Sequence, residues 1–321
     1  MNKLAMKHLM PVGGALLATA ILAGCGGGEE SSTEPVATAA APMQATQMAE
    51  PGAPQFLGNT ASDGFNWFNF RRQQAQLAPV ARNALLDAAA QGHSDYQRIN
   101  DVISHDQTPG ARGFTGAKLE DRLRAAGFRF TQSNYAFGEV ISATGDTSGF
   151  NAADDLITAI YHRFVILEPM FTEAGSASAT VPNGYTYFTT DFAANGLGPG
   201  LASGVIATYP VPDQTNIPTV FFSDRETPDP VQDRNEVGFP ISVHANITST
   251  IAVQSMVVHA SGGAPLPTRL LTTANDPTNT RLSVAAIVPL APLAPQTVYQ
   301  VEFVGSVDGV PVSRSWSFRT R

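Results

Sequence analysis

Three polar residues, far apart in the sequence, are the candidates for chemistry. His105 follows an expected helix, Glu139 lies in a Gly-Glu-Val-Ile-Ser run, and His162 lies in Tyr-His-Arg. Two imidazoles and a carboxylate suit a divalent metal with an open coordination position, Zn²⁺ first, which could activate a water for hydrolysis. The same side chains could instead form a hydrogen-bonded cluster in which Glu139 orients both rings. Their spacing does not separate these two possibilities.

The sequence offers no recognisable nucleophile. It contains no Gly-x-Ser-x-Gly run and no His-Glu-x-x-His pair, and its single cysteine is Cys25 near the N-terminus. Those motifs would place a serine beside its base, or two histidines and a general base around zinc. Whether the protein is an enzyme therefore stays open. A binding role is the expectation, and metal-assisted hydrolysis is the alternative.

Residues 59–195 have a pattern of mixed helices and strands. Apolar residues recur at three- and four-residue steps in the helical segments, and the strand-like segments are rich in aromatic residues. The expected elements, in order, are helices at about 66–72, 80–102 and 116–126, strands at 128–130 and 137–142, a helix at 151–166, and a strand at 185–192. His105 thus follows the long helix, Glu139 lies on a strand, and His162 lies on the last helix.

A second domain is expected over residues 217–321, after a Gly/Pro-rich linker at 196–216. From about Ile217 the apolar period changes to two, and seven short strands can be traced with no convincing helix between them. Asp308-Gly309 predicts a tight turn between the last two strands. Short strands with alternating patterning favour an immunoglobulin-like sandwich.

The N-terminus predicts a lipid-anchored protein. Lys3 and Lys7 precede an apolar stretch that ends in Leu-Ala-Gly before Cys25, which is typical of a bacterial lipoprotein signal peptide at residues 1–24. A plain secretory peptide with an incidental thiol, or a membrane anchor, is the alternative. Residues 25–58 are rich in Gly, Ser, Thr, Ala and Pro and predict a flexible tether. Because no aspartate follows Cys25, we expect the outer membrane, with the domains facing the periplasm or the exterior.

The composition argues against a nucleic-acid partner. The chain is 43% hydrophobic and 14% charged, and its formal charge is −8. A protein that binds a phosphate backbone needs a basic patch or stripe, and the sequence contains none. The expected partners are therefore the membrane, through the lipid on Cys25, and an unidentified extracellular ligand.

Six separated blocks between Asn69 and Phe192 resemble the CAP superfamily, which comprises cysteine-rich secretory proteins, antigen 5 and pathogenesis-related 1 proteins. The resemblance is to its compact bacterial branch and rests on the order of the blocks. They are Leu86–Ser94, Ile103–His105, Asp121–Phe128, Phe137–Ser142, His162–Gly175 and Tyr187–Phe192. The resemblance implies an α-β-α sandwich, so that the whole chain is expected to be α+β, with the immunoglobulin-like sandwich following the CAP domain.

The resemblance also implies one cleft lined by His105, Glu139 and His162, which are then the candidate metal ligands. Many family members add a second acidic residue, and this correspondence fails here. Asp155 and Asp154 are the candidates, but both are also explained as stabilisers of the first turn of a helix that Asn151 would cap. No cofactor is certain; Zn²⁺ is the candidate.

These observations predict a cell-surface lipoprotein whose CAP domain binds a lipid, a glycan or a protein in the cleft. The alternative is an extracellular hydrolase that depends on a divalent metal in the same cleft. A third possibility is an adhesion surface with a vestigial cleft. In each case the sandwich would hold the CAP domain away from the membrane.

Overall fold

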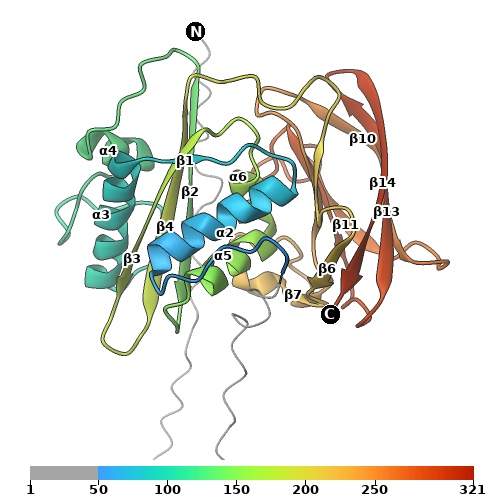
Figure 1. Ribbon diagram of the computed structural model, residues 1–321, viewed down its shortest axis with the longest axis horizontal. Helices are drawn as coiled ribbons and strands as arrows, with labels where there is room; N and C mark the ends of the chain where they lie inside the picture. The colour runs from blue at the N-terminus through green and yellow to red at the C-terminus, as the bar shows by residue number, and fades with distance from the viewer. Residues whose placement is uncertain (1–49) are drawn as a thin grey trace, which may run out of the picture.

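The computed structural model describes residues 50–321. The expected signal peptide, the lipidation site Cys25 and most of the tether lie outside the described residues. The fold is α+β: a three-layered first part with helices on both faces of a sheet packs beside a second part made of strands (Figure 1). Within residues 50–321 no helix is long and apolar enough to cross a membrane.

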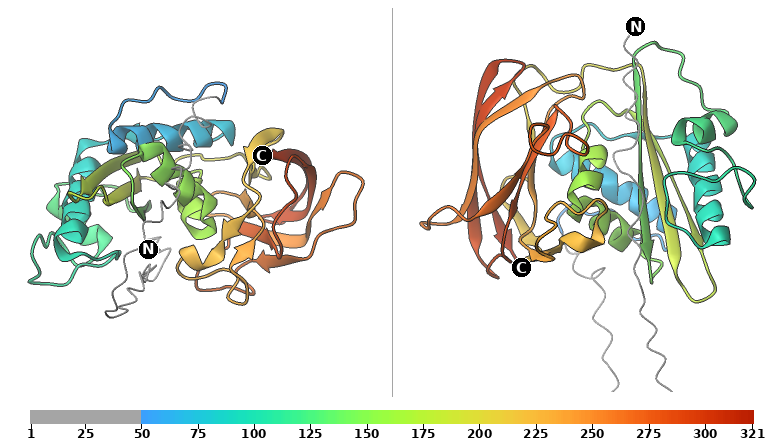
Figure 2. Two further views of the ribbon diagram at one scale, coloured as in Figure 1. Left: turned by 90° about the horizontal axis from the view of Figure 1, so that it is seen from below. Right: turned by 180° about the vertical axis from the view of Figure 1, so that it is seen from behind.

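The first part is built on a four-stranded sheet with the order β1-β3-β4-β2. Two helices cover one face, and three lie between the other face and the second part (Figures 1 and 2). The strands are β1 (Ala81–Arg82), β2 (Tyr135–Thr144), β3 (Glu173–Thr180) and β4 (Thr186–Asn195). The helices are α3 (Ala84–Asn100) and α4 (Leu119–Ala125) on the outer face, and α2 (Thr60–Gln74), α5 (Gly149–Thr158) and α6 (Ile160–Ile166) on the inner face.

The alternation of side chains along β2 separates the two faces of the sheet. Tyr135 and Phe137 belong to the small core under α3 and α4, whereas Ala136 and Val140 belong to the large core shared with α5 and α6. Glu139 follows the parity of Tyr135 and Phe137, because successive residues of a strand point to opposite faces. The strand therefore directs Glu139 toward α3 and α4.

The helix boundaries differ from those expected in several places: α2 begins at Thr60 rather than near 66, and α4 begins at Leu119 rather than at 116. The long helix begins at Ala84 rather than near 80, because Asn83 caps it and the two preceding residues pair with β3. The expected helix at 151–166 is two helices, α5 and α6, interrupted at Ala159, whose ψ of 118° is extended. Its cap is Ser148 and not Asn151, since the Ser148 hydroxyl accepts from the Asn151 amide. No acidic residue therefore lies in the first turn of α5.

The second part consists of two four-stranded sheets with the orders β11-β12-β9-β5 and β10-β13-β14-β6. Read as strands A to G, these orders are D-E-B-A and C-F-G-A′, the topology of an immunoglobulin-type sandwich. A short hairpin, β7 with β8, and a 3-10 turn at Ser223–Arg225 precede β9. The strands are β5 (Ala207–Tyr209), β6 (Gln214–Ile217), β7 (Phe221–Phe222), β8 (Glu236–Val237), β9 (Ile241–His244), β10 (Ile251–Ala260), β11 (Thr268–Leu271), β12 (Val284–Pro289), β13 (Val298–Val307) and β14 (Val310–Thr320).

The expected linker at 196–216 contains two strands of the sandwich. β5 pairs with β9, and β6 pairs in parallel with β14. The boundary predicted at residue 217 was therefore too late, because these strands are too short to show a period of two. The predicted tight turn is present: Asp308 and Gly309 both have positive φ, 52° and 80°, as a two-residue hairpin turn requires.

Residues 50–58, which were assigned to the flexible tether, are attached to the first part. The Glu50 carboxylate accepts two hydrogen bonds from the Arg71 guanidinium at 2.6 and 2.8 Å. The Phe56 ring packs edge-on against Phe150 with 5.9 Å between centroids, and the Leu57 amide donates to the Asp63 carboxylate. These contacts correct the tether prediction for this stretch.

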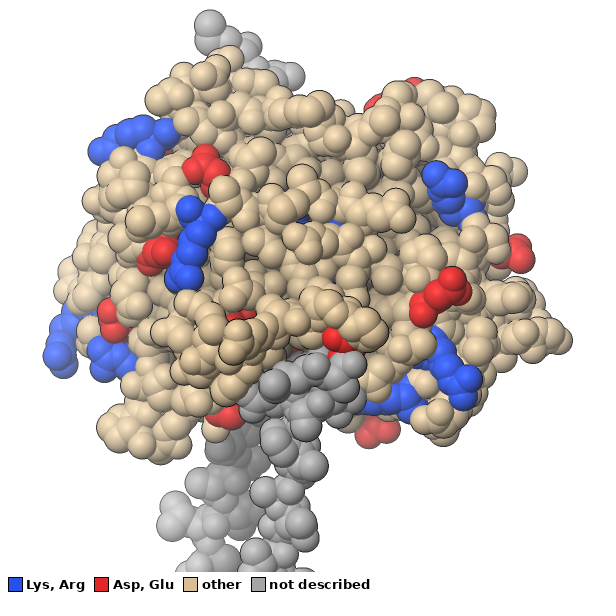
Figure 3. All heavy atoms as spheres, viewed as in Figure 1, with Lys and Arg blue, Asp and Glu red and all other residues tan. Residues whose placement is uncertain are grey.

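Charged side chains are sparse on the face of the molecule shown in Figure 3. Lysines and arginines are scattered over the view, many beside acidic residues, and uncharged side chains cover most of it. Surface ion pairs such as Arg124–Glu120 and Arg269–Asp233 follow the same mixed pattern. The expectation that nucleic acid is not a partner stays a prediction.

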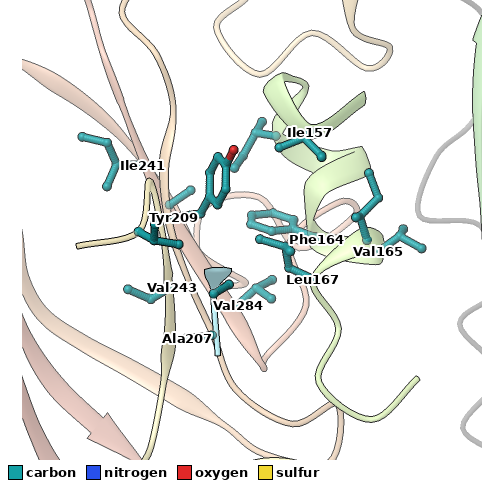
Figure 4. Close-up of a cluster of buried hydrophobic side chains, with 14 of the residues drawn as sticks. Ile157, Phe164, Val165, Leu167, Ala207, Tyr209, Ile241, Val243 and Val284 are labelled. Atoms are coloured by element: carbon teal, nitrogen blue, oxygen red, sulfur yellow. The ribbon is translucent and has the colours of Figure 1, made fainter. Parts of the chain in front are cut away.

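The two parts share one apolar core. Phe164 and Leu167 of the α6 segment point toward Tyr209, Val243 and neighbouring side chains of the sandwich, whereas Val165 lies on the opposite side of α6, toward the sheet (Figure 4). The Arg163 side chain is buried in this interface, where it donates to the Pro240 carbonyl at 2.7 Å and lies over the Tyr209 ring at 4.8 Å. Each part thus covers apolar surface that the other would leave exposed to water.

Gly175 sets how closely α3 can approach the sheet. A Cβ at this position would lie 2.1 Å from the Asp87 nitrogen and 2.2 Å from the Leu86 carbonyl carbon, both backbone atoms of α3. We predict that Gly175→Ala lowers the free energy of unfolding by about 3 kcal/mol, because the helix must move away from a packed sheet. Urea unfolding of the full chain measures this.

Gly145→Ala is the matched control, since a Cβ there would meet nothing within 4 Å. Its stability should stay within about 0.5 kcal/mol of wild type. Equal stabilities of the two variants would contradict the close packing of α3 on β3.

Candidate functional site

The centre of the candidate site is the buried carboxylate of Glu139 on β2. One oxygen, Oε2, accepts from the Arg122 guanidinium of α4 at 2.6 Å, and the other, Oε1, accepts from His105 Nδ1 at 2.8 Å. The side chains of Glu139 and Arg122 are 2% and 0% exposed. A charge removed from water to this extent needs a partner of opposite sign, and Arg122 supplies it.

The surroundings keep Glu139 ionised. Burial alone would raise its pKa, but Arg122, His93 and the hydrogen bond from His105 outweigh burial and hold the pKa well below its ordinary value. Because the carboxylate is charged, His105 donates from Nδ1, so Glu139 sets the position of the His105 proton.

His93 of α3 anchors the loop that carries His105. Thr115 N donates to Gln107 Oε1 at 2.7 Å, which orients the amide so that its nitrogen donates to His93 Nδ1. His93 Nε2–H then donates to the Ser104 carbonyl at 2.7 Å. Burial lowers the pKa of His93 to about 4, so this ring is neutral at physiological pH.

Further contacts hold the His105 loop against α3 and α4. Arg122 donates to the His105 carbonyl at 2.8 Å, and the Tyr96 hydroxyl accepts from the Thr108 amide at 2.9 Å. The ring of His105 is 12% exposed, in contrast to the 0% of His93. The loop therefore presents a partly accessible imidazole. Glu139 fixes the ring of His105, and Arg122 fixes its backbone.

Asp191 on β4 is a second buried carboxyl beside Glu139. The two residues are register partners across β2 and β4, and Asp191 is completely buried. Neither of its side-chain oxygens accepts a hydrogen bond from a donor among the described residues. Burial and the nearby Glu139 charge raise the pKa of Asp191 well above its ordinary value, so it is the neutral member of the pair.

His162 does not join this cluster. It lies in α6, which packs on the other face of the sheet: a Cβ on Gly138 would meet Val165 of α6 at 2.7 Å, whereas Glu139 points the opposite way. The ring of His162 pairs instead with Glu226 of the second part, with 3.0 Å between Nδ1 and Oε1. The structure corrects the predicted three-residue cleft: it unites His105 with Glu139 and gives His162 a separate partner.

Glu226 also caps α6. Its carboxylate accepts from the amides of Ile160 and Tyr161 at 2.8 and 2.7 Å, and from the His162 amide at 3.3 Å. The residue in the cap position, Ala159, has no side chain able to do this. An anion from the second domain thus satisfies the unpaired amides of a helix in the first.

The predicted zinc ligands do not form a metal site. Among the described residues no three His, Cys, Asp or Glu side chains are grouped so that they could hold a metal ion. His105 Nδ1 is engaged with Glu139, His93 Nε2 is engaged with the Ser104 carbonyl, and His162 lies elsewhere. The donor set expected for His105, Glu139 and His162 is therefore not assembled.

The two candidate acidic residues lie outside the cluster as well. Asp154 accepts from the Trp67 indole at 3.0 Å on the inner face of the sheet. Asp155 is exposed on α5. The residues that do complete the site, Arg122, His93 and Asp191, were missed because nothing in their local sequence shows that distant segments meet at Glu139.

Residues 65–192 match the family model described as CAP, the cysteine-rich secretory protein family. No curated protein matches the chain. The match covers the sheet of the first part and the helices on both of its faces. This part of the chain is therefore a CAP domain.

Three solved structures are similar to parts of the chain. An extracellular protein containing an SCP domain from Bacillus anthracis is 24% identical, with a TM-score of 0.35, over 42% of this chain and 40% of that one. An outer surface protein from Borrelia burgdorferi is 10% identical, with a TM-score of 0.33, over 40% and 88%. A cysteine-rich secretory protein from Staphylococcus aureus is 15% identical, with a TM-score of 0.31, over 42% and 38%. The chain thus spans less than half the length of the first and third.

The neutral state of His93 predicts a pH-dependent stability. The folded pKa, about 4, lies below the ordinary value of 6.5, so between these values only the unfolded chain takes up the proton and stability falls as pH falls. The free energy of unfolding of wild type minus that of His93→Gln should decrease by about 3 kcal/mol from about pH 7.5 to about pH 4. Urea titrations at several pH values measure it, and a pH-independent difference would contradict it.

The capping role of Glu226 predicts a stability loss in Glu226→Gln. The amide retains an acceptor but loses the charge that pairs with His162 and the α6 amides, so we expect a loss of about 1–3 kcal/mol. Glu236→Gln, an exposed carboxylate on β8, is the control. If both variants unfold at the same urea concentration, Glu226 does not stabilise the interface.

Proposed function

We propose that this chain is a non-enzymatic, lipid-anchored CAP protein of the cell envelope that binds an extracellular ligand at the His105–Glu139 pair. The ligand is a lipid, a glycan or a protein group able to hydrogen-bond to an imidazole. The observation that carries the proposal is the partly exposed His105 ring, held in one orientation by a buried and charge-compensated carboxylate.

Preorganisation is what makes this pair suited to binding. The Arg122–Glu139 ion pair fixes the ring, and the hydrogen bonds of His93, Gln107 and Tyr96 fix the loop. A ligand that meets a side chain already held in its bound orientation loses less conformational entropy on binding. Two of the three residues of the expected cleft take part, and His162 is assigned to the domain interface instead.

The cell-envelope location rests on the sequence and on the printed names of similar structures. Cys25 follows a lipoprotein-type signal, and two of the similar structures are described as an extracellular protein and an outer surface protein. Lipid on Cys25 would hold the two domains at a membrane surface, with the outer membrane as the proposed address.

The metal-dependent hydrolase is the weaker candidate. It needs His105, Glu139 and His162 around one ion, and the sheet separates His162 from the other two. Glu139 is moreover paired with Arg122, so that a cation bound there would be repelled by the guanidinium or would have to displace it.

Ligand capture tests the binding proposal. The purified full chain is incubated with lipid and glycan extracts of bacterial envelopes, and retained compounds are identified by mass spectrometry. We predict that His105→Gln lowers retention by about tenfold. The reason is that a hydrogen bond between the ligand and an imidazole that is itself held by a buried carboxylate contributes on the order of 1–2 kcal/mol. His259→Gln, a histidine on β10 of the sandwich, is the control.

Two outcomes would contradict the proposal. Folded wild-type protein that retains no compound, or retention unaffected by His105→Gln, would remove the assigned site. Titration of the same proteins with zinc separates the alternative: micromolar binding by wild type that is lost in both His105→Gln and His162→Gln would favour the metal-dependent hydrolase.

A further inference from the structure

A pocket opens between the two domains on the inner face of the sheet. Its volume is about 20 Å³, room for about one water, so a larger molecule enters only where the Glu50 side chain moves away; both domains contribute to its walls. The residues that matter for its chemistry are Arg71, Asp154, Tyr209, Asn216, Arg321 and Glu50. None of them belongs to the His105–Glu139 cluster, so the pocket is independent of the function proposed above.

Arg71, in the last turn of α2, is the most strongly held charge in this pocket. Its side chain is 5% exposed, and its guanidinium lies over the Trp67 ring at 4.5 Å. Asp154 lies 3.5 Å from one end of the guanidinium and accepts from the Trp67 indole, which fixes the position of both groups. The Arg71 Nε atom is buried without a hydrogen-bond partner in the described part of the chain.

The Glu50 carboxylate binds the Arg71 guanidinium in the way that a carboxylate ligand would. Its two carboxylate oxygens accept from the two terminal nitrogens of the guanidinium, at 2.6 and 2.8 Å. This paired geometry is the one by which arginine recognises carboxylates. Glu50 comes from the segment that precedes α2, outside the residues that match the CAP family model.

We propose that the pocket binds a small dicarboxylate, with one carboxylate replacing Glu50 on Arg71 and the other reaching Arg321 at the rim. Among the described residues that line the pocket, these two are the cationic ones. Exchange of one carboxylate for another leaves the buried guanidinium paired throughout, so the cost of an isolated buried charge is avoided. Gln214 and Asn216 of the sandwich also line the pocket.

Glu50 acts as an internal competitor in this arrangement. A tethered group competes at an effective concentration of roughly millimolar, so a free dicarboxylate must exceed this to enter. Removing the Glu50 charge should therefore strengthen binding, and removing Arg71 should abolish it. A merely structural Arg71–Glu50 pair would give neither effect.

Calorimetric titration with succinate tests the proposal on the full chain at low ionic strength. Glu50→Gln should bind succinate at least about tenfold more tightly than wild type. Glu302→Gln, an exposed carboxylate on the sandwich, should bind like wild type. Propionate, which has one carboxylate, should bind more weakly than succinate, and Arg321→Gln should remove that difference.

Arg71 is tested in the Glu50→Gln background so that the Glu50 carboxylate is not left unpaired. Arg71→Gln should abolish succinate binding, and Arg71→Lys, which keeps the charge but loses the two-pronged contact, should weaken it at least about tenfold. Circular dichroism and thermal unfolding verify that each variant is folded. The proposal is overturned if Glu50→Gln binds succinate no more tightly than wild type, or if folded Arg71→Lys binds it equally well.

His105 is not part of this pocket. A failure of the succinate-binding proposal can therefore be distinguished from a failure of the proposed function. Loss of succinate binding leaves the envelope-ligand capture unaffected, and the His105→Gln variant should retain the succinate affinity of wild type. A change of succinate affinity in His105→Gln would show that the two sites are not independent and would overturn the assignment to the pocket.

Discussion

The buried ion pair between Arg122 and Glu139 is the constraint on which the candidate site depends. A carboxylate on an inward-facing position of a strand must be compensated, and α4 supplies the guanidinium that does so. The same guanidinium binds the His105 carbonyl, while the carboxylate binds the His105 ring. One pair of charges thus positions both the backbone and the side chain of His105, and the loop packing follows from that.

The sheet divides the expected site into two histidine–glutamate pairs. On the outer face, Glu139 and His105 come from the same domain and are supported by Arg122 and His93. On the inner face, His162 pairs with a carboxylate from the sandwich, which also caps α6. The alternation of side-chain directions along β2 causes this separation, because Gly138 and Glu139 are adjacent in sequence but face opposite sides of the sheet.

Local sequence signals predicted local structure well and missed what depends on distant contacts. The turn at Asp308-Gly309 was predicted from residues that favour positive φ. The helix predicted to end at 126 ends at Ala125, before Gly127, whose φ is 93°. β3 was not predicted, because Glu-Ala-Gly-Ser-Ala-Ser-Ala-Thr has a single β-branched residue, Thr180, and no aromatic residue. Gly175 is required there by the backbone of α3. His105 and Glu139 were identified by their resemblance to family blocks, whereas Arg122 and Asp191 carry no such mark.

The sandwich is part of what stabilises the CAP domain and not merely a spacer that presents it. The family match ends at residue 192, but the α6 amides bind Glu226, Arg163 donates to the Pro240 carbonyl, and the Glu168 carboxylate accepts from the Ile247 amide. Without the second domain these buried groups would lose their partners, and the apolar side of α6 would face water. A helix that other chains could cap locally is capped here from another domain. The two domains are therefore expected to unfold together.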